Sequence, residues 1–240
     1  MRGIILAGGS GSRLYPLSRV TNKHLLPVGK KPMIYYPIET LKQLGCDKIL
    51  IVTGGNDIGD FMKLLGSGMK FGVDFTYKIQ DEAKGIADAL MRAEDFCEGE
   101  ELFPVILGDN IFQFKTVPKI KRAAQVFLYK HDNPERFGVV EWDNGYIKKI
   151  IEKPKNPPSN HIVTGLYVYD CSVFDFIKTM KPSDRGELEI TDVNNWYLRT
   201  SEFTFNIFEG DWKDAGTFES LQAATKMVAV EGGKKDVKRK

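Results

Sequence analysis

The first half of the chain alternates short apolar runs with segments of helical periodicity, and this alternation restricts the fold more than any other feature. The apolar runs end in turn residues, as buried strands do, at 3–7, 48–55, 73–80 and 102–109. Between them, apolar residues recur every three or four positions over 33–45, 57–66 and 85–96. Strands that alternate with helices form parallel sheets covered on both faces. We therefore predict an α/β fold with a Rossmann-like, doubly wound and mainly parallel mixed sheet.

The second half has a different texture, because its strands follow one another closely. Predicted strands at 125–130, 137–142, 146–153 and 161–170 precede predicted helices at 172–180, at 187–200 and from residue 218. The sequence Asp-Asn-Gly at 143–145 predicts a hairpin turn. We expect one domain over 1–231, with a β-rich second half that begins near residue 116, and a frayed basic tail over 232–240.

Three glycines and two serines follow the first predicted strand, in the stretch LAGGSGSRLYP at 6–16. A Walker A loop is excluded because no Lys-Ser or Lys-Thr pair follows the last glycine. The dinucleotide fingerprint also fails, since Leu14 stands where its third glycine belongs. A backbone cradle for an anion remains, with Arg13 as a guanidinium partner. The alternative is an ordinary surface turn.

Charge and cysteine content exclude several classes of protein. The net charge of +2, from 34 basic and 32 acidic residues, is too balanced for a chain that coats nucleic acid or an acidic membrane. The 3 cysteines form no Cys-x-x-Cys pair, which favours a reducing compartment over a disulfide framework or a zinc site. The sequence shows no signal-peptide pattern and no apolar run of membrane-spanning length. We expect a cytoplasmic protein that binds neither nucleic acid nor membrane.

Further motifs follow the glycine loop in a fixed order. They are NKHLLP, KPMIYYP, IQDEAKGIADAL, ILGDN, NPERFGVV, IEKP, VTGLYVYD, RGELEITDVN and WKDAGT. Together with LAGGSGSRLYP, they resemble the sugar-1-phosphate nucleotidyltransferases, and the resemblance extends from Gly3 to about Leu221. A short piece such as LGD occurs in many proteins, but the ordered set is specific.

The resemblance implies a magnesium-dependent enzyme that transfers a thymidylyl group from dTTP to α-D-glucose 1-phosphate, giving dTDP-glucose and pyrophosphate. Its product would feed deoxysugar synthesis of the dTDP-rhamnose type and polysaccharide synthesis. Two alternatives stay open: a uridylyltransferase that uses UTP, and a catalytically silent module that binds sugar nucleotides. The chain keeps the four charged residues named below, which favours the enzyme. Apolar positions on the second-half strands leave room for a homo-oligomer. Longer members carry C-terminal helices with a regulatory nucleotide site, which we do not expect here.

On the nucleotide side, the residues that match the family's motifs lie in the first half, to about residue 115. The triphosphate would lie over the glycine loop, with Arg13 on the leaving pyrophosphate and Lys23 on the α- or β-phosphate; alternatively, Arg13 only ties the loop to a carboxylate. Gln80 would pair with the pyrimidine, beside the backbone of Gly85. The implied nucleotide-binding residues are Leu6, Ala7, Gly8, Gly9, Gly11, Ser12, Arg13, Lys23, Gln80 and Gly85, and the implied catalytic residues are Arg13, Lys23 and Asp109.

The resemblance also makes Asp109 and Asp214 the protein ligands of one Mg²⁺ ion. Phosphate oxygens and water would complete its shell. Each aspartate has an alternative structural role: Asp109 as a helix cap or in an Asx turn, and Asp214 as the cap of the helix near Thr217. We expect a solvent-facing carboxylate at Asp109, at the end of its strand. Ala215 stands where the family usually has threonine, and we expect metal binding to survive this loss of a hydroxyl.

On the sugar side, Glu152 would accept hydrogen bonds from glucose hydroxyls, while Lys153 and Arg185 would bind the phosphate. Glu-Lys-Pro is also typical of a solvated strand end. Phe137 replaces a frequent tyrosine of the family, so no polar contact is expected from its ring. No histidine is needed as a base, because a phosphate monoester is already ionised at pH 7. The implied sugar-phosphate residues are Ile86, Asp109, Gly138, Glu152, Lys153, Val163, Gly165 and Arg185.

Overall fold

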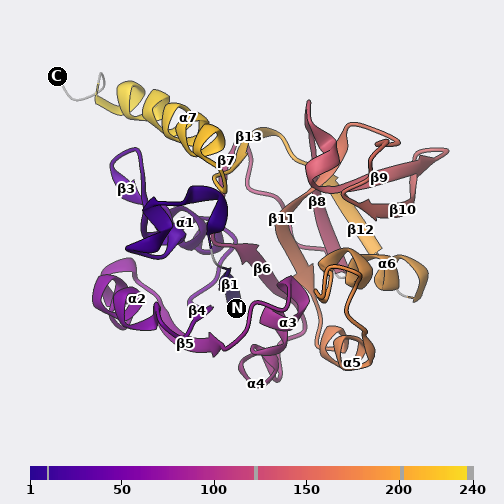
Figure 1. The fold of residues 1–240 in the computed structure, drawn as a ribbon, viewed down its shortest axis with the longest axis horizontal. Coiled ribbons are helices and arrows are strands. Elements are labelled where there is room, and N and C mark those ends of the chain that lie inside the picture. Colours follow the sequence, from indigo (N-terminus) through magenta and orange to yellow (C-terminus); the bar gives the residue numbers. More distant parts are fainter. Residues whose placement is uncertain (10, 122–123, 201–202, 237–240) are drawn as a thin grey trace.

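The computed structural model describes residues 1–9, 11–121, 124–200 and 203–236. Within these ranges the central sheet has nine strands, seven of them in the spatial order β10-β9-β11-β6-β1-β4-β5, while β8 pairs with β11 and with β12 (Figure 1). These strands are β1 (Arg2–Ala7), β4 (Lys48–Gly54), β5 (Asp74–Gln80), β6 (Phe103–Leu107), β8 (Ala124–Lys130), β9 (Gly138–Asp143), β10 (Tyr146–Glu152), β11 (His161–Tyr169) and β12 (Phe203–Ile207).

The four first-half strands of this sheet, β5-β4-β1-β6, are parallel throughout. Each falls on a strand that the sequence predicts. The direction changes where β11 pairs antiparallel with β6, and most second-half pairs are antiparallel as well. The prediction of a Rossmann-like, mainly parallel mixed sheet is confirmed, with the parallel part confined almost entirely to the first half.

Helices cover both faces of the parallel strands, as buried parallel strands require. Along β1, Ile4 and Leu6 pack in the cluster that contains α3, α5 and α6, whereas Ile5 and Ala7 pack in the cluster that contains α1 and α2. This alternation follows the two-residue period of a strand. The helices are α1 (Tyr35–Gln43), α2 (Ile58–Leu65), α3 (Ile86–Met91), α4 (Glu94–Cys97), α5 (Ser172–Thr179), α6 (Ile190–Thr200) and α7 (Phe218–Asp236).

Two predicted helices have different bounds in the structure. The helix predicted over 85–96 is divided into α3 and α4, because Arg92 and Ala93 donate to carbonyls three residues back and interrupt the α-helical ladder. The helix predicted from 187 begins only at Ile190. The backbone of Leu188 is already engaged there, donating to the Lys84 carbonyl and accepting from the Ala87 amide. This pairing also connects the two halves of the molecule.

The chain after residue 217 differs from the prediction as well. Helix α7 continues to Asp236, so 232–236 are helical where a frayed tail was predicted, and 237–240 lie outside the described residues. Extending an existing helix is far cheaper than starting one, even through polar residues. The predicted hairpin between β9 and β10 is confirmed, with positive φ angles at Asn144 and Gly145. None of the described helices is long and apolar enough to cross a bilayer.

Two small antiparallel ribbons were not predicted from the sequence. One joins β2 (Pro27–Val28) to β3 (Lys31–Pro32), and the other joins β7 (Asn110–Phe114) to β13 (Gly210–Asp214). The second ribbon pairs segments that are far apart in the sequence. Its register places Asp214 opposite Asn110, which directly follows Asp109. The ribbon therefore brings the two predicted metal ligands, Asp109 and Asp214, close together.

Candidate active site

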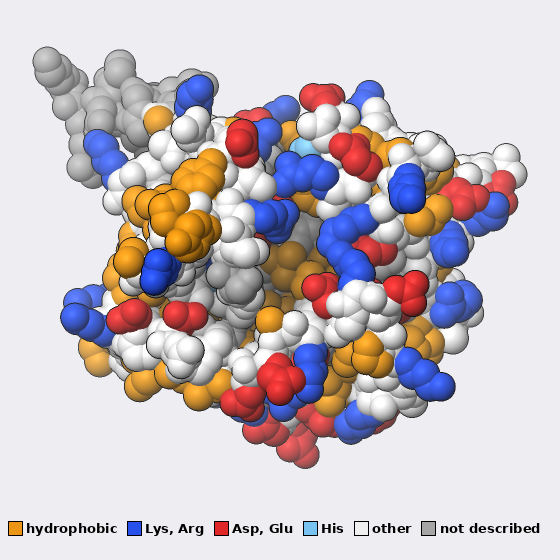
Figure 2. All heavy atoms as spheres, in the orientation of Figure 1, with side chains coloured by type: hydrophobic (Ala, Val, Ile, Leu, Met, Phe, Trp, Pro, Cys, Tyr) orange, Lys and Arg blue, Asp and Glu red, His pale blue; other side chains and the backbone are white. Residues whose placement is uncertain are grey.

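The site lies at the carboxyl ends of β1 and β6. The chain leaves β1 toward β4 on one side, while β6 lies on the other side, and ligands of open α/β sheets bind where the order reverses in this way. A cavity of about 340 Å³ opens at this point, with walls from both halves of the chain. Figure 2 shows it as a hollow with Lys and Arg side chains on its rim.

Most of the residues implied by the resemblance line this one cavity. They are Leu6, Gly8, Gly9, Arg13, Lys23, Gln80, Gly85, Ile86, Asp109, Gly138, Glu152, Lys153, Val163, Gly165, Arg185 and Asp214. Three others are not on its wall. Ala7 is buried in the core cluster of α1 and α2, Gly11 packs against Ser18, and Ser12 is exposed.

The glycine loop approaches the ligand space through its backbone. A Cβ atom at Gly8 would lie 2.5 Å from Gln80 Oε1, so any larger residue would have to displace that amide. Gly11 has a φ of +61°, and its carbonyl accepts a 2.7 Å hydrogen bond from Ser18 Oγ. The loop is therefore held from behind by Ser18. Ser10 lies outside the described residues.

Arg13 is an exposed guanidinium that faces a carboxylate without pairing to it. Among the described residues no ion pair includes Arg13, so the alternative in which it only ties the loop to a carboxylate finds no support. A Cβ atom at Gly216 would lie 2.8 Å from Asp214 Oδ1, 3.4 Å from Arg13 Nη2 and 3.5 Å from Asp109 Oδ2. One cation and two anions thus converge on one point of the cavity wall.

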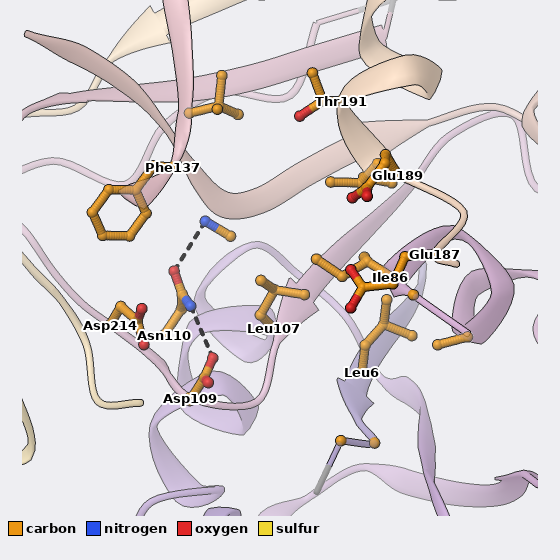
Figure 3. A pocket seen from close by; sticks show the side chains of 18 of the residues that line it. Leu6, Ile86, Leu107, Asp109, Asn110, Phe137, Glu187, Glu189, Thr191 and Asp214 are labelled. Carbon is orange, nitrogen blue, oxygen red and sulfur yellow. Dashed lines mark hydrogen bonds between the residues drawn. The ribbon is translucent and has the colours of Figure 1, made fainter. Parts of the chain in front are cut away.

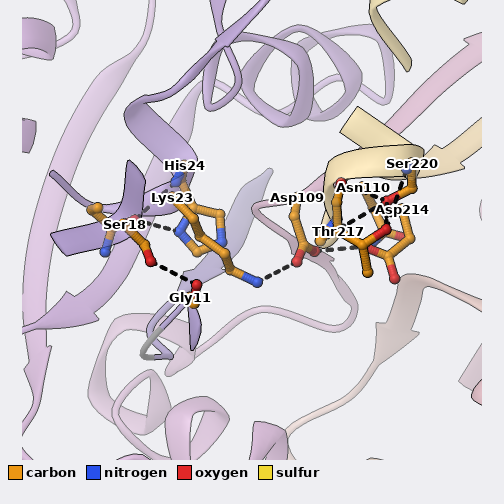
Figure 4. A network of polar contacts seen from close by, with 11 residues as sticks. Gly11, Ser18, Lys23, His24, Asp109, Asn110, Asp214, Thr217 and Ser220 are labelled. Carbon is orange, nitrogen blue, oxygen red and sulfur yellow. Dashed lines mark hydrogen bonds and ion pairs between the residues drawn. The ribbon is translucent and has the colours of Figure 1, made fainter. Parts of the chain in front are cut away.

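Lys23 projects from a 3₁₀ turn, Lys23–Leu25, and its ammonium forms an ion pair with Asp109 (Figure 4). Asn22 caps this turn: its Oδ1 accepts a 2.9 Å hydrogen bond from the His24 amide and lies 2.7 Å from His24 Nδ1. Burial, and then the charge of Lys23, lower the pKa of His24 to about 3. The imidazole is therefore neutral and supports the turn that carries Lys23.

Asp109 and Asp214 form a close pair of carboxylates, brought together by the β7–β13 ribbon. Asp109 is buried, which contradicts the prediction of a solvent-facing carboxylate; the backbone of Ala215 donates to its carbonyl and Lys23 covers its side chain. Burial is the largest single influence and raises the pKa of Asp109, but the charges of its neighbours, Lys23 first, and the hydrogen bonds from Lys23 and Asn110 together hold that pKa well below its usual value. Burial, and then the charge of Asp109, raise the pKa of Asp214 to about 6.

This carboxylate pair fits a divalent cation. Two repelling carboxylates share one lysine, and among the described residues no group of three His, Cys, Asp or Glu side chains gathers to hold a metal. A metal here would need phosphate oxygens from a ligand, which is how Mg²⁺ is usually bound. Asp214 is not the cap of α7: its Oδ1 accepts from the Gly216 amide, and Thr217 Oγ1 accepts from the Ser220 amide. Ala215 is buried in an apolar cluster, where a threonine hydroxyl would lack water.

Asn110 was not singled out from the sequence, although it belongs to the quoted ILGDN motif. Its Nδ2 donates to Asp109 Oδ1 at 3.0 Å, and its Oδ1 accepts from the Gly165 amide at 2.9 Å and from Trp212 Nε1 at 2.8 Å. Figure 3 shows this amide between Asp109 and β11. Asn110 thus fixes Asp109 relative to β11. Its position next to the predicted ligand Asp109 was the sequence feature that could have indicated it. Trp212 and Thr191 also line the cavity and were not predicted, although they belong to the quoted motifs WKDAGT and RGELEITDVN.

The cavity wall that the second half of the chain supplies contains a network of charges. Glu152 Oε2 accepts a 2.6 Å hydrogen bond from Thr191 Oγ1, and its Oε1 lies 3.3 Å from Arg185 Nη2 and 3.5 Å from Lys153 Nζ. Arg185 also donates to both carboxylate oxygens of Glu189, at 3.1 and 2.7 Å. Both predicted phosphate-binding cations are therefore already paired with carboxylates, and Lys153 holds a φ of +43°, unusual for a residue with a side chain.

Part of the cavity wall, which includes Phe137 and Trp212, is aromatic. The Phe137 ring lies 5.6 Å from the Trp212 ring and 5.0 Å from the His131 ring. Phe137 therefore packs in an aromatic cluster, consistent with the expectation of no polar contact from this ring. Arg136 covers its other side, 5.8 Å from the ring centre. His131 and His161 take no place among the described residues that line the cavity.

Comparison with known proteins agrees with this site. The family model for nucleotidyl transferases matches residues 2–231. The glucose-1-phosphate thymidylyltransferase of Neisseria meningitidis is 45% identical over 95% of this chain and 82% of its own length. The enzyme of the same name from Mycolicibacterium smegmatis is 42% identical, with the same two coverages.

Solved structures have the same fold. A crystal structure from Bacillus anthracis, provisionally named as a glucose-1-phosphate thymidylyltransferase and solved in complex with sucrose, superposes with a TM-score of 0.89 and 54% identity over 94% of each chain. A UDP-glucose pyrophosphorylase with bound UDP-glucose shares the fold at a TM-score of 0.84 and 24% identity, over 96% of this chain and 98% of its own. The chain belongs to the nucleotidyl transferase family.

Proposed function

We propose that the protein transfers the thymidylyl group of dTTP to α-D-glucose 1-phosphate. The observation that carries this proposal is the arrangement of one cavity: unpaired Arg13 and the Lys23–Asp109 pair face Asp214, and Glu152 and its neighbours form the opposite wall. Two polyanions can meet there between cations from both halves. The names of the relatives from Neisseria and Mycolicibacterium point to the same substrates.

The reaction is a direct displacement at phosphorus. A phosphate oxygen of the sugar phosphate attacks the α-phosphorus, a new P–O bond forms, and the bond to the bridging oxygen of pyrophosphate breaks. Negative charge grows on the leaving group, and Arg13 is the cation placed to stabilise it. Lys23 would hold the α- or β-phosphate in line. No base is required, because the attacking oxygen carries no proton at pH 7.

Asp109 and Asp214 would hold a Mg²⁺ ion together with substrate phosphates. The ion would supply charge neutralisation for two phosphate groups that otherwise repel. Lys23 keeps the Asp109 carboxylate ionised, and Asn110 keeps it oriented, so this residue is ready to accept a cation. On the sugar side, Glu152 would accept hydrogen bonds from glucose hydroxyls, with the phosphate near Lys153 and Arg185.

Pyrophosphate release tests the proposal. We expect release from dTTP and Mg²⁺ only when glucose 1-phosphate is present, with UTP as a slower substrate. Omission of the sugar phosphate, and omission of the metal, are the controls. Folded protein that releases no pyrophosphate with either nucleotide would contradict the proposal, and preference for UTP would move it to uridylyl transfer.

A further inference from the structure

Gln80 places a hydrogen-bond acceptor in the wall of the cavity. The residue ends β5, is only 6% exposed and lines the cavity beside Gly8. Its Nε2 donates to Asp88 Oδ2 at 2.8 Å and to the Gly85 carbonyl at 3.2 Å. Its Oε1 lies over the Gly8 backbone, where among the described residues no donor forms a hydrogen bond with it. Because the Gln80 side chain lines the cavity, this acceptor is open to a hydrogen-bond donor on a ligand.

The orientation of this amide follows from the chemistry of its neighbours. An ionised carboxylate and a backbone carbonyl can only accept hydrogen bonds. With Asp88 and Gly85 on one side, the Gln80 amide must turn its NH₂ group toward them, since the reverse orientation would set three acceptors against one another. Both N–H groups are then used. Gln80 therefore offers the cavity an acceptor and no donor.

Asp88 is itself held in place. It lies on the first turn of α3, and Arg92 Nη2 donates to its Oδ1 at 3.1 Å from one turn further along. The start of this helix is also fixed: Gly85 has a φ of +103°, and a Cβ atom there would lie 2.6 Å from the Leu188 carbonyl oxygen. The chain Arg92–Asp88–Gln80 thus fixes an amide inside the cavity from residues behind its wall.

We propose that Asp88, supported by Arg92, is a positioning residue that selects the nucleobase by locking the Gln80 amide with Oε1 toward the ligand. The inference rests on the proposed function, in which Gln80 meets a pyrimidine. Thymine and uracil carry a hydrogen on N3 and donate to this acceptor, whereas cytosine carries a lone pair at N3 and is repelled. The lock therefore excludes cytosine nucleotides and does not separate dTTP from UTP.

The variant Asp88→Asn tests the lock. Asparagine keeps the shape but can donate to Gln80 Oε1, which lets the glutamine amide turn its NH₂ group toward the base. For the wild type we expect kcat/KM for dTTP to exceed that for dCTP about 100-fold or more. In the variant this ratio should fall roughly tenfold, with dTTP losing and dCTP gaining. The KM for glucose 1-phosphate should stay unchanged. Asp95→Asn, an exposed aspartate on α4, is the matched control and should leave the ratio unaltered.

Arg92→Met provides a second variant that keeps both Gln80 and Asp88. It removes one support of the carboxylate, so the same ratio should fall by a smaller factor of about 2 to 3. An unchanged ratio in folded Asp88→Asn, or equal losses for dTTP and dCTP, would overturn the proposal. Direct titration of dTTP and dCTP into each protein gives the same comparison without turnover. If the wild type binds dTTP over dCTP but transfers nothing to the sugar phosphate, the proposed function fails and the base selection stands.

Discussion

The arginines on the two sides of the cavity have different surroundings. On the nucleotide side Lys23 is paired with Asp109, but Arg13 is exposed and has no ion pair among the described residues. On the sugar side, Arg185 lies within 3.5 Å of the carboxylates of Glu152, Glu187 and Glu189. An incoming phosphate meets a free cation on the first side. On the second side it must compete with carboxylates that already occupy the cation.

This difference suggests an order in which the two anionic substrates bind to the cavity. The nucleotide side uses a backbone loop and a free guanidinium, so it is ready for a triphosphate before any ligand arrives. The sugar side is a closed charge network that must rearrange around a phosphate. We infer that the nucleotide binds to the free protein more easily than the sugar phosphate does. Three substitutions test the two sides, from the largest expected effect to the smallest, and a fourth tests the histidine that supports the turn carrying Lys23.

Asp214→Asn should have the largest effect. Removing one carboxylate of the proposed metal pair should lower kcat roughly 100- to 1,000-fold, because only one protein ligand remains. The melting temperature should stay equal or rise, since burial, and then repulsion from Asp109, raise the pKa of Asp214 to about 6 and the amide carries no charge to bury or repel. Asp211→Asn, exposed on the same strand, is the control. Near-normal turnover of Asp214→Asn at limiting Mg²⁺ would refute the metal assignment.

Arg13→Ala should lower kcat/KM for dTTP about 100-fold, with the loss mainly in kcat because the charge it meets grows during the reaction. Stability should not change, since Arg13 is exposed and has no ion pair among the described residues. Arg19→Ala, an exposed arginine that follows in the same loop, is the matched control. A pure increase in KM with unchanged kcat would place Arg13 in ground-state binding instead.

Arg185→Gln tests the sugar side. The substitution removes one contact to the sugar phosphate. The resulting loss of affinity is partly offset, because the wild-type contact forms only after the ion pairs of Arg185 with Glu152 and Glu189 are broken. We therefore expect KM for glucose 1-phosphate to rise only about tenfold, with unchanged affinity for dTTP. Arg199→Gln, exposed near the end of α6, should behave like the wild type. A rise in KM for dTTP as well would erase the distinction between the two sides.

His24→Gln should change the pH dependence of stability. The folded-state pKa is about 3 and the unfolded value about 6.5, so only the unfolded chain takes a proton as the pH falls below 6.5. His24 therefore removes about 2 kcal/mol of stability between pH 7.5 and pH 5. Chemical denaturation at both pH values should show a smaller loss for His24→Gln. Equal losses in the two proteins would mean that His24 is protonated in the folded state.

The sequence was sufficient for the parallel half of the fold and for most of the residues around the cavity. Apolar runs that end in glycine place β1 and β6 correctly, because burial on both faces leaves a simple pattern. The β7–β13 ribbon was missed, since its strands are short, distant in sequence and paired only in the folded chain. The burial of Asp109 was missed for the same reason: what covers it comes from Lys23 and from that ribbon.

Local chemistry was the harder part to predict. The sequence indicated Gln80 and Arg185 as ligand-binding residues. It did not indicate that Asp88 orients the Gln80 amide or that Glu189 pairs with Arg185. These contacts depend on where α3 and α6 begin. Both starts are set by the pairing of Leu188 with Lys84 and Ala87, a contact between distant segments that no local pattern encodes.

The contrast between the two sides is tested most directly by calorimetric titration of the free protein, in separate experiments with dTTP and Mg²⁺ and with glucose 1-phosphate. We predict that dTTP binds about tenfold more tightly, because the sugar phosphate must open several existing ion pairs of Arg185, each worth up to about 1 kcal/mol. Glucose 1-phosphate binding the free protein as tightly as dTTP would contradict this account.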